Sequence, residues 1–445
     1  MKKIRLDTVI FIACITILGL ISLFDPDKPT ESVQENRKLD EIPVFTVNSY
    51  LSGAYTSSLS SYYADIFTGR EGLLQINRDI KRLFAIKKDA VIIITEETPY
   101  PSSTPIASPD ETATPSPDTG STPVISSPVP TESPTYVKAS KIEVLVSPFL
   151  LVDGQVVGEI WPNTASLDTY ITFMNELAAG MDEGVNVYSM VVPSHIEYFD
   201  LAGFESRTAS QKDTVGYIAD KTDQNVLDVD VYDALFSHCH EYIYYRTDHH
   251  WTHLGAYYAY CSLLETMGKE EEIIPLEDYT VAEVIEGYIG SGYRKTNRDE
   301  RVLLNPDTMT AYYPIVGYTF MMYKDTGEEE RRLNDMSYVI PNEEWYNMFM
   351  STGSGRYHVF TTDVKNGSTL LLVSDSYGES MIHFLLPYYE KIIMIDSRYY
   401  DKAFMGGMTL DEYAKYIKAD DIVVLQYMES VAYAFNTDAL YSLLQ

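Results

Sequence analysis

Apolar residues in the second half of the chain form two patterns that predict two kinds of element. Helical spacing occurs at residues 167–179, 252–267 and 379–389, and Thr252 is a suitable N-cap for the second of these helices. Continuous apolar runs, typical of strands buried on both faces, occur at residues 185–192, 225–229, 370–373, 391–395 and 422–426. Short strands that alternate with helices predict a three-layer α/β/α fold, in which helices cover both faces of a mainly parallel sheet.

Residues 270–365 interrupt this alternation. They are rich in tyrosine and in charged residues, and their apolar positions follow no regular period. We therefore expect loops or a small β-rich excursion from the main sheet in this stretch.

The first 24 residues have the pattern of a membrane-targeting segment. Residues 1–5 are basic, and an apolar run follows from Thr8 to Phe24. About 17 apolar residues are the lower limit for a helix that spans a bilayer, and no small-x-small cleavage pattern follows the run. The sequence therefore predicts an uncleaved, single-pass signal anchor at residues 1–24. Because positive charges stay inside, the remaining chain is expected outside the cytoplasm.

Residues 97–136 form a low-complexity tract that holds ten of the 21 prolines and is rich in serine and threonine. Such a composition cannot bury apolar surface, so the tract is expected to be extended and disordered. It is either a stalk between membrane and domain or an insertion inside one domain. An insertion is favoured, because residues 59–80 suit two amphipathic helices and residues 91–94 suit a buried strand. We therefore predict one domain made of residues 25–96 and 137–445.

Composition narrows the class of protein. A net charge of −32 argues against nucleic acid as a partner and favours a soluble extracytoplasmic domain. The 37 tyrosines suit contacts with sugars, and suit the core and surface of any secreted protein equally well. Three cysteines exclude a disulfide scaffold and a four-thiolate zinc site. Cys239 and Cys261 could form one disulfide, or Cys261 could lie buried on its helix.

Two motifs supply the parts of a serine acyl-transfer site. In Thr-Asp-His-His-Trp-Thr (residues 247–252), Asp248 can orient His250 as a general base, since alternate residues of an extended segment point to the same side. In Val-Ser-Asp-Ser-Tyr-Gly (residues 373–378), Ser376 falls just past a predicted strand and at the start of a helix. Backbone N–H groups and the helix dipole would stabilise an oxyanion there. The two motifs predict a Ser376–His250–Asp248 triad, which needs no metal and no cofactor.

Each motif also has a simpler interpretation. Ser-Asp-Ser between strand and helix can be only a helix cap, and an isolated Asp-x-His is common. The two motifs together, in a sequence that predicts an α/β fold, favour a serine active site over these simpler interpretations. Ser374 and His249 are the nearest rivals for the two roles. Ser374 still belongs to the strand, and His249 is expected to point away from His250 if the segment is extended.

Residues 247–252 resemble the signature of the DHHW protein family. That group is similar to the SGNH-like O-acetyltransferases of bacterial polysaccharide export, such as the alginate acetylation proteins, in which an Asp-x-His-Trp motif precedes an Asp-Ser motif as it does here. The resemblance extends to Glu-Asn-Arg at residues 35–37 and to residues 65–70 and 396–400. It therefore covers most of residues 30–430 and supports the insertion.

The resemblance implies an SGNH-hydrolase-like domain that transfers or removes O-acetyl groups on a cell-surface polysaccharide. Ser376 would take the acetyl group, His250 would be the base and Asp248 would orient it. A transferase would also need an acetyl donor, supplied through a separate membrane acetyl exporter. The membrane itself would be contacted through the N-terminal helix.

Three further positions are candidates for contacts with substrate or the oxyanion: Arg398, Tyr377 and Trp251. For Arg398, a structural pair with a carboxylate is an equal alternative. One position departs from the family pattern, because Ser374 stands where many relatives have glycine. Its side chain is expected to narrow the pocket or change the oxyanion geometry. The separate Gly and Asn that SGNH enzymes supply to the oxyanion hole cannot be identified.

Two other functions fit parts of the sequence. A metal-dependent phosphoesterase would use a crowd of potential ligands: His238, His240, Asp248, His249, His250 and His253. That class needs further Asp motifs on a leading strand, which we do not find. A non-catalytic surface protein that holds cell-wall glycan would suit the abundant tyrosines and the altered turn.

Overall fold

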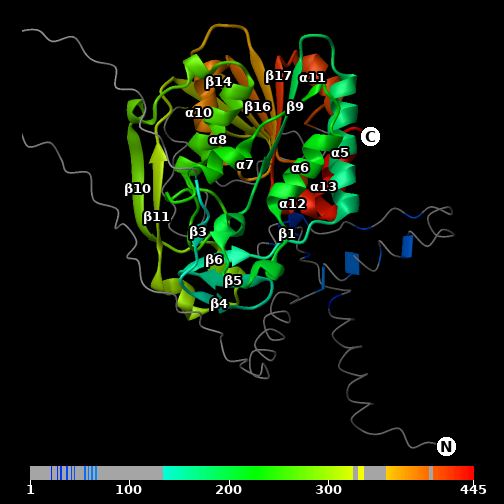
Figure 1. The fold of residues 1–445 in the computed structure, drawn as a ribbon. Helices are drawn as coiled ribbons and strands as arrows, with labels where there is room; N and C mark the ends of the chain where they lie inside the picture. Colours follow the sequence, from blue (N-terminus) through cyan, green and yellow to red (C-terminus); the bar gives the residue numbers. More distant parts are fainter. Residues whose placement is uncertain are drawn as a thin grey trace, which may run out of the picture.

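The computed structural model describes residues 134–323, 329–334, 357–399 and 404–445, together with scattered residues between 22 and 67. These residues form a mixed α/β fold around one eight-stranded sheet (Figure 1). The strand order is β13-β12-β14-β16-β15-β17-β7-β9. The strands are β7 (Asn186–Val192), β9 (Val226–Asp228), β12 (Tyr318–Tyr323), β13 (Glu329–Asn334), β14 (Tyr357–Thr362), β15 (Thr369–Ser374), β16 (Lys391–Ile395) and β17 (Asp421–Tyr427).

The sheet is parallel on one side and antiparallel on the other. β16, β15, β17, β7 and β9 pair in parallel, whereas β14, β12 and β13 add antiparallel pairs at the β16 edge. The sheet is therefore mixed, and the prediction of a mainly parallel sheet is correct only for the strands that come from continuous apolar runs. β12 and β14 lie in the stretch expected to leave the main sheet, and they extend it instead. β12 alternates buried and half-buried residues, as antiparallel strands with one covered face do.

Two groups of helices cover the sheet, which runs between them in Figure 1. One group packs around α5 (Thr164–Gly180): α6 (Gln211–Lys221), α11 (Leu410–Ile417), α12 (Met428–Ala432) and α13 (Ala434–Ser442). The other consists of α7 (Val231–Phe236), α8 (His253–Thr266) and α10 (Gly378–Leu385).

The order of the crossovers explains why the helices divide in this way. The chain leaves β15 through α10 to reach β16, then returns through α11 to β17 on the far side of β15. Right-handed crossovers in opposite directions place α10 and α11 on opposite faces. Every residue of β15 and β17 is buried, as expected for strands covered on both faces.

The elements predicted from apolar patterns are confirmed as β7, β9, β15, β16 and β17 and as α5, α8 and α10. Thr252 caps α8, because its Oγ1 accepts a hydrogen bond from the N–H of Gly255 at 3.3 Å. α10 is shorter than predicted. It ends at Leu385 and a 3-10 turn (Leu386–Tyr388) follows, since Pro387 cannot continue an α-helix.

Smaller elements surround the main sheet. β4 (Ile142–Val144), β5 (Phe149–Val152) and β6 (Gln155–Gly158) form an antiparallel meander, and β3 (Val137–Lys138) pairs with β8 (Phe199–Asp200). β10 (Val281–Tyr288) and β11 (Asp307–Tyr312) form an antiparallel pair that stands beside the main domain (Figure 1). Two short strands, β1 (Glu31–Ser32) and β2 (Arg37–Lys38), pair with each other. The β10–β11 pair and the chain between its strands border the candidate site.

Most predictions for the amino-terminal third lie outside the described residues. These are the apolar run at 8–24 except Ser22, most of the helices at 59–80, the strand at 91–94 and nearly all of the Pro-rich tract. In the part of the chain that the structure describes, no helix combines the length and apolar composition needed to cross a membrane. Cys239 and Cys261 are both free thiols, Cys239 buried and Cys261 half-buried, so the structure contains no disulfide between them.

Candidate active site

The Asp-His-His-Trp motif lies in a narrow loop that leads into α8. Tyr244 and Trp251 form an isolated antiparallel bridge, and the N–H of Tyr245 donates to the carbonyl of His250 at 3.2 Å. The residues at the tip form bends and no extended strand. The premise of an extended motif is therefore wrong, although Asp248 and His250 do face each other.

Asp307, the first residue of β11, holds this loop in place from 61 residues further along the chain than Arg246. Its carboxylate is fully buried and accepts hydrogen bonds from the N–H groups of Arg246 at 2.7 Å and Thr247 at 2.8 Å. It also accepts bonds from the hydroxyls of Thr247 and Tyr242. Sequence reasoning missed Asp307, because nothing in its local pattern links it to a loop about 60 residues earlier.

Asp248 is the centre of the loop's polar contacts. One carboxylate oxygen, Oδ1, accepts from His250 Nδ1 at 2.5 Å, and the other, Oδ2, accepts from the N–H of Ser291 at 2.6 Å and the hydroxyl of Tyr288 at 3.3 Å. Burial by itself would raise the pKa of Asp248, but the adjacent His250 and His249 outweigh it and hold that pKa well below its usual value. Asp248 is therefore a buried, ionised carboxylate.

The close approach of the chain to Asp248 requires glycine at position 290. A Cβ at Gly290 would lie 2.5 Å from Asp248 Oδ2 and 2.9 Å from its Cα. Gly290→Ala is expected to push Ser291 away from Asp248 and to lower the free energy of unfolding by about 1–3 kcal/mol. It is also expected to weaken the hydrogen bond between Asp248 and His250 Nδ1. The measurement is urea unfolding, with Gly216→Ala as a control. Gly216 is an exposed helical residue with open space for a Cβ, and alanine has a higher helix propensity than glycine. Equal stability of the two variants would contradict this reading of Gly290.

Ser376 lies at the turn between β15 and α10, where the sequence placed it, and its Oγ is 2.7 Å from His250 Nε2. The turn is fastened by Asp375, which is buried and accepts from the N–H of Tyr427 at 2.8 Å and the hydroxyl of Ser430 at 2.7 Å. Because β17 lies beside β15, Asp375 ties the turn to the carboxyl end of its neighbouring strand. Open α/β sheets bind ligands at this end.

The backbone donors of the turn are largely occupied. The N–H of Tyr377 donates to Asp375 Oδ1 at 3.0 Å, that of Gly378 to the carbonyl of Asp375, and that of Glu379 to the carbonyl of Ser376. The N–H of Ser376 makes none of these bonds and is a candidate donor to an oxyanion.

Ser374, expected to narrow the pocket or to change the oxyanion geometry, has its side chain buried beneath the turn, and its effect on the oxyanion geometry stays a prediction. Its side chain is fully buried, and its Oγ donates to the carbonyl of Asp375 at 2.8 Å. It lies directly against Gly378, where any Cβ would overlap the Ser374 hydroxyl. Ser374 therefore packs beneath the turn, against the start of α10.

Trp251 and Tyr377 are placed as supports of the site and not at its surface. Trp251 is completely buried, and its Nε1 donates to Ser380 Oγ at 2.7 Å and to the carbonyl of Tyr377 at 3.2 Å. Tyr377 is also buried; its hydroxyl donates to the carbonyl of His249, and its ring stacks on Tyr427 with centroids 4.6 Å apart. These two side chains join the loop of His250 to the turn of Ser376, and their predicted contact with substrate or the oxyanion stays a prediction.

Arg398 forms the pair with a carboxylate that was the structural alternative for this residue. Its Nε and Nη2 donate to the two carboxylate oxygens of Asp396 at 2.9 and 2.6 Å. This bidentate pair fixes the guanidinium of Arg398 at the end of β16, beside Asp396, which lies two residues earlier in the chain. The contact leaves the predicted substrate role of Arg398 untested.

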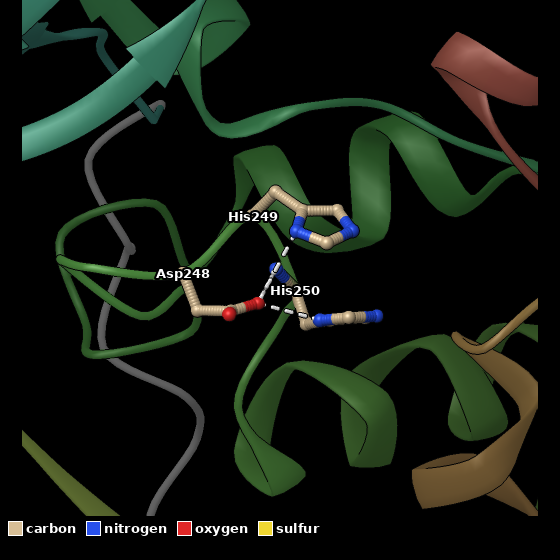
Figure 2. Close-up of side chains that lie close together, drawn as sticks. All are labelled: Asp248, His249 and His250. Carbon is tan, nitrogen blue, oxygen red and sulfur yellow. Dashed lines mark hydrogen bonds and ion pairs between the residues drawn. The ribbon is translucent and has the colours of Figure 1, made fainter. Parts of the chain in front are cut away.

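His249 does not point away from His250, which corrects another expectation. The two rings lie with centroids 4.0 Å apart, and Figure 2 shows both extending from Asp248 toward the same side. The reason is the bent backbone, which turns consecutive side chains in one direction. His249 Nδ1 is 2.9 Å from Ser291 Oγ and 3.3 Å from Asp248 Oδ1.

Asp248, His249 and His250 also form the one group of possible metal ligands that we find among the described residues. One ligand atom from each lies within 4.8 Å of the others. The other histidines of the motif region have different neighbours. His238 contacts Glu241, His240 contacts the carbonyl of Thr135, and His253 accepts from the N–H of Tyr312.

Comparison with known proteins identifies relatives of this fold. The family model described as DHHW protein matches residues 35–112 and 123–395, on both sides of the Pro-rich centre. The crystal structure of a DHHW family protein from Eubacterium siraeum DSM 15702 is 29% identical, covers 69% of this chain and 98% of its own, and superposes with a TM-score of 0.58. No curated protein matches the chain.

Two other solved structures are more distant. Bacillus cereus PatB1 with a sulfonyl adduct is 15% identical, covers 65% of this chain and 97% of its own, and has a TM-score of 0.52. The O-acetyltransferase domain of Pseudomonas putida AlgJ is 13% identical, covers 68% of this chain and 98% of its own, and has a TM-score of 0.35. PatB1 shares the fold, and the AlgJ superposition is too weak to inform function.

Proposed function

Because the chain belongs to the DHHW protein family and joins a serine, a histidine and an aspartate by hydrogen bonds, we propose that it is an acyltransferase or esterase that acts on O-acetyl groups. The observation that carries the proposal is the series Ser376 Oγ, His250 Nε2, His250 Nδ1 and Asp248 Oδ1, with spacings of 2.7 and 2.5 Å. This is the arrangement that activates a serine hydroxyl for attack on a carbonyl.

In the proposed first step, Ser376 Oγ attacks the acetyl carbonyl while His250 Nε2 takes the serine proton. The tetrahedral intermediate collapses, the bond to the leaving oxygen breaks, and His250 returns the proton to that oxygen. The acetyl group remains as an ester on Ser376. In the second step a sugar hydroxyl or water attacks this ester, His250 takes the incoming proton, and Ser376 is released with its proton restored.

Electrostatics of the site suit this cycle. The low pKa of Asp248 keeps a negative charge beside His250 Nδ1, where it stabilises the imidazolium that forms in each step. The N–H of Ser376 is the proposed donor to the oxyanion, helped by the start of α10 two residues later. General acid–base help of this kind contributes about 10²–10⁴-fold in rate.

The proposed setting is the outer face of a cell membrane. The apolar run at residues 8–24 would anchor an SGNH-like domain outside the cytoplasm, where a cell-surface polysaccharide is the substrate. The net charge of −32 suits that location and opposes nucleic acid as a partner. A transferase in this place would receive acetyl groups through a separate membrane exporter.

The test is intact mass of the purified full chain after brief exposure to p-nitrophenyl acetate, followed by peptide mapping. A single acetyl adduct on Ser376 is expected. An arylsulfonyl fluoride would serve as a second reagent for the same hydroxyl. An adduct on another residue, or none, would overturn the serine mechanism.

A metal-dependent hydrolase remains the second candidate, because three possible ligand atoms lie within 4.8 Å of one another at the same loop. A metal held by this group would take one ring nitrogen of His250, either Nδ1, which bonds to Asp248, or Nε2, which contacts Ser376, and so would disrupt the serine arrangement. The two candidates therefore respond to a chelator in opposite ways. Adduct formation that survives the chelator supports the serine, whereas a phosphoesterase activity lost on chelation would support the metal.

A further inference from the structure

His249 sits beside the proposed base but is more open to solvent. Its side chain is 27% exposed, compared with 7% for His250 and 2% for Asp248. The far nitrogens of the two rings, away from Asp248, lie on the same side in Figure 2. His250 Nε2 contacts Ser376 Oγ at 2.7 Å, so the far nitrogen of His249 lies on the side of His250 that carries this contact.

The contacts of His249 Nδ1 favour one of the two neutral forms of its ring. Nδ1 lies 3.3 Å from Asp248 Oδ1 and 2.9 Å from Ser291 Oγ. An ionised carboxylate only accepts hydrogen bonds, so the proton is favoured on Nδ1. In a neutral ring Nε2 then holds a lone pair and accepts a hydrogen bond.

We propose that His249 Nε2 binds the acyl acceptor by accepting a hydrogen bond from a hydroxyl next to the one that attacks acetyl-Ser376. The substrate class is therefore a sugar with neighbouring free hydroxyls. This inference rests on the proposed acyl-enzyme and adds to it the residue that selects a sugar over water. The attacking hydroxyl gives its proton to His250 and its oxygen forms the new ester, while the acyl bond to Ser376 Oγ breaks and His250 passes the proton to that oxygen. His249 holds the neighbouring hydroxyl and exchanges no proton.

Two amide substitutions separate this role from a structural one. In His249→Asn the amide lies near the position of Nδ1, so the contact with Asp248 is kept and the acceptor at Nε2 is lost. In His249→Gln the amide reaches the position of Nε2, so an acceptor is kept and the contact with Asp248 is lost. If His249 binds the acceptor, the Asn variant should lose more function than the Gln variant. If His249 only supports Asp248, the Gln variant should lose more.

The experiment measures how the acetyl group of acetyl-Ser376 divides among acceptors in the full-length protein. Methyl β-D-glucopyranoside supplies neighbouring hydroxyls, and methanol supplies a single one. The wild type is expected to prefer the glucoside to methanol, and His249→Asn to lose that preference by about tenfold, the effect of one hydrogen bond. His249→Gln is expected to retain most of it. Formation of the adduct reports that each variant is folded.

His238 offers a matched control, since it is also partly exposed and its Nδ1 contacts the carboxylate of Glu241 at 2.7 Å. His238→Asn should leave the preference as in the wild type. Damage that is equal or greater in His249→Gln than in His249→Asn would overturn the inference, as would no change in His249→Asn. A wild-type adduct without preference for the glucoside would overturn it and leave the proposed nucleophile standing. Absence of any wild-type adduct would overturn the proposed function itself.

Discussion

Turnover of an acetyl ester is expected to fall by about 10⁴-fold or more in Ser376→Ala, and by about 10⁴-fold in Asp248→Asn. Alanine removes the atom that receives the acetyl group. Asparagine acts through the tautomer of His250. Its oxygen is held toward the N–H of Ser291, as Asp248 Oδ2 is now, so that its NH₂ faces His250 Nδ1. The proton of His250 then moves to Nε2, and a protonated Nε2 cannot accept the proton of Ser376.

The double variant distinguishes a working triad from independent contacts. If Ser376, His250 and Asp248 act as a unit, Ser376→Ala/Asp248→Asn is expected to be no slower than Ser376→Ala alone. Steady-state rates with p-nitrophenyl acetate measure this, and urea unfolding shows that each variant is folded. Losses that multiply in the double variant would contradict a shared mechanism.

Stability of the domain is expected to fall steeply as the pH drops from 7 to 5. His253 and His383 are both buried, and the N–H of Tyr312 donates to His253 Nδ1, which requires that nitrogen to be deprotonated. Burial lowers the pKa of His383 to about 3 and that of His253 well below its usual value. The unfolded chain binds protons on these residues below about pH 6.5 and the folded chain does not, so acid favours unfolding.

The expected size is about 1.4 kcal/mol per pH unit below pH 6.5 for His383, or about 2 kcal/mol at pH 5, and His253 acts in the same direction. Such a loss is large against a typical free energy of unfolding of about 5–15 kcal/mol. Asp228 acts in the opposite direction, because burial raises its pKa to about 6 and the folded state then binds the extra proton. The contribution of one histidine is therefore best isolated by substitution.

Urea unfolding of the wild type and of His383→Gln at pH 7 and pH 5 provides that comparison. The variant is expected to lose about 2 kcal/mol less than the wild type between the two pH values, whatever its stability at pH 7. Equal losses would show that His383 titrates alike in the folded and unfolded chain. The same experiment with His238→Gln is the control, since that side chain is 35% exposed.

Patterns within short stretches of sequence predicted the elements and contacts that residues close in sequence form. The apolar run that became β15 and the hydroxyl just past it placed Ser376 at the strand-to-helix turn. The Asp-x-His spacing brought Asp248 to His250. In both cases the relevant groups are neighbours in sequence, and the pairing of the two motifs followed from chemistry.

The remaining features depend on contacts between distant segments. Asp307 and Gly290 support the loop of Asp248 from an irregular stretch, and their roles arise only when β10 and β11 pair. The direction of His249 follows from the bent backbone of a loop that is bonded to Asp307. The antiparallel side of the sheet was missed because β12 and β14 join it through strands distant in sequence, without a continuous apolar run.

The packing of Ser374 against Gly378 has a consequence for how this protein can change over evolutionary time. With serine at position 374, every other residue at position 378 would overlap its hydroxyl, so only glycine fits there. With glycine at position 374, that constraint would disappear, and the nearest atom to a new Cβ would be the flexible end of Met394 at 3.3 Å. The two positions are thus coupled, and the order of substitution matters. A lineage that has acquired Ser374 must lose it before it can explore a different residue at the start of the helix behind the nucleophile.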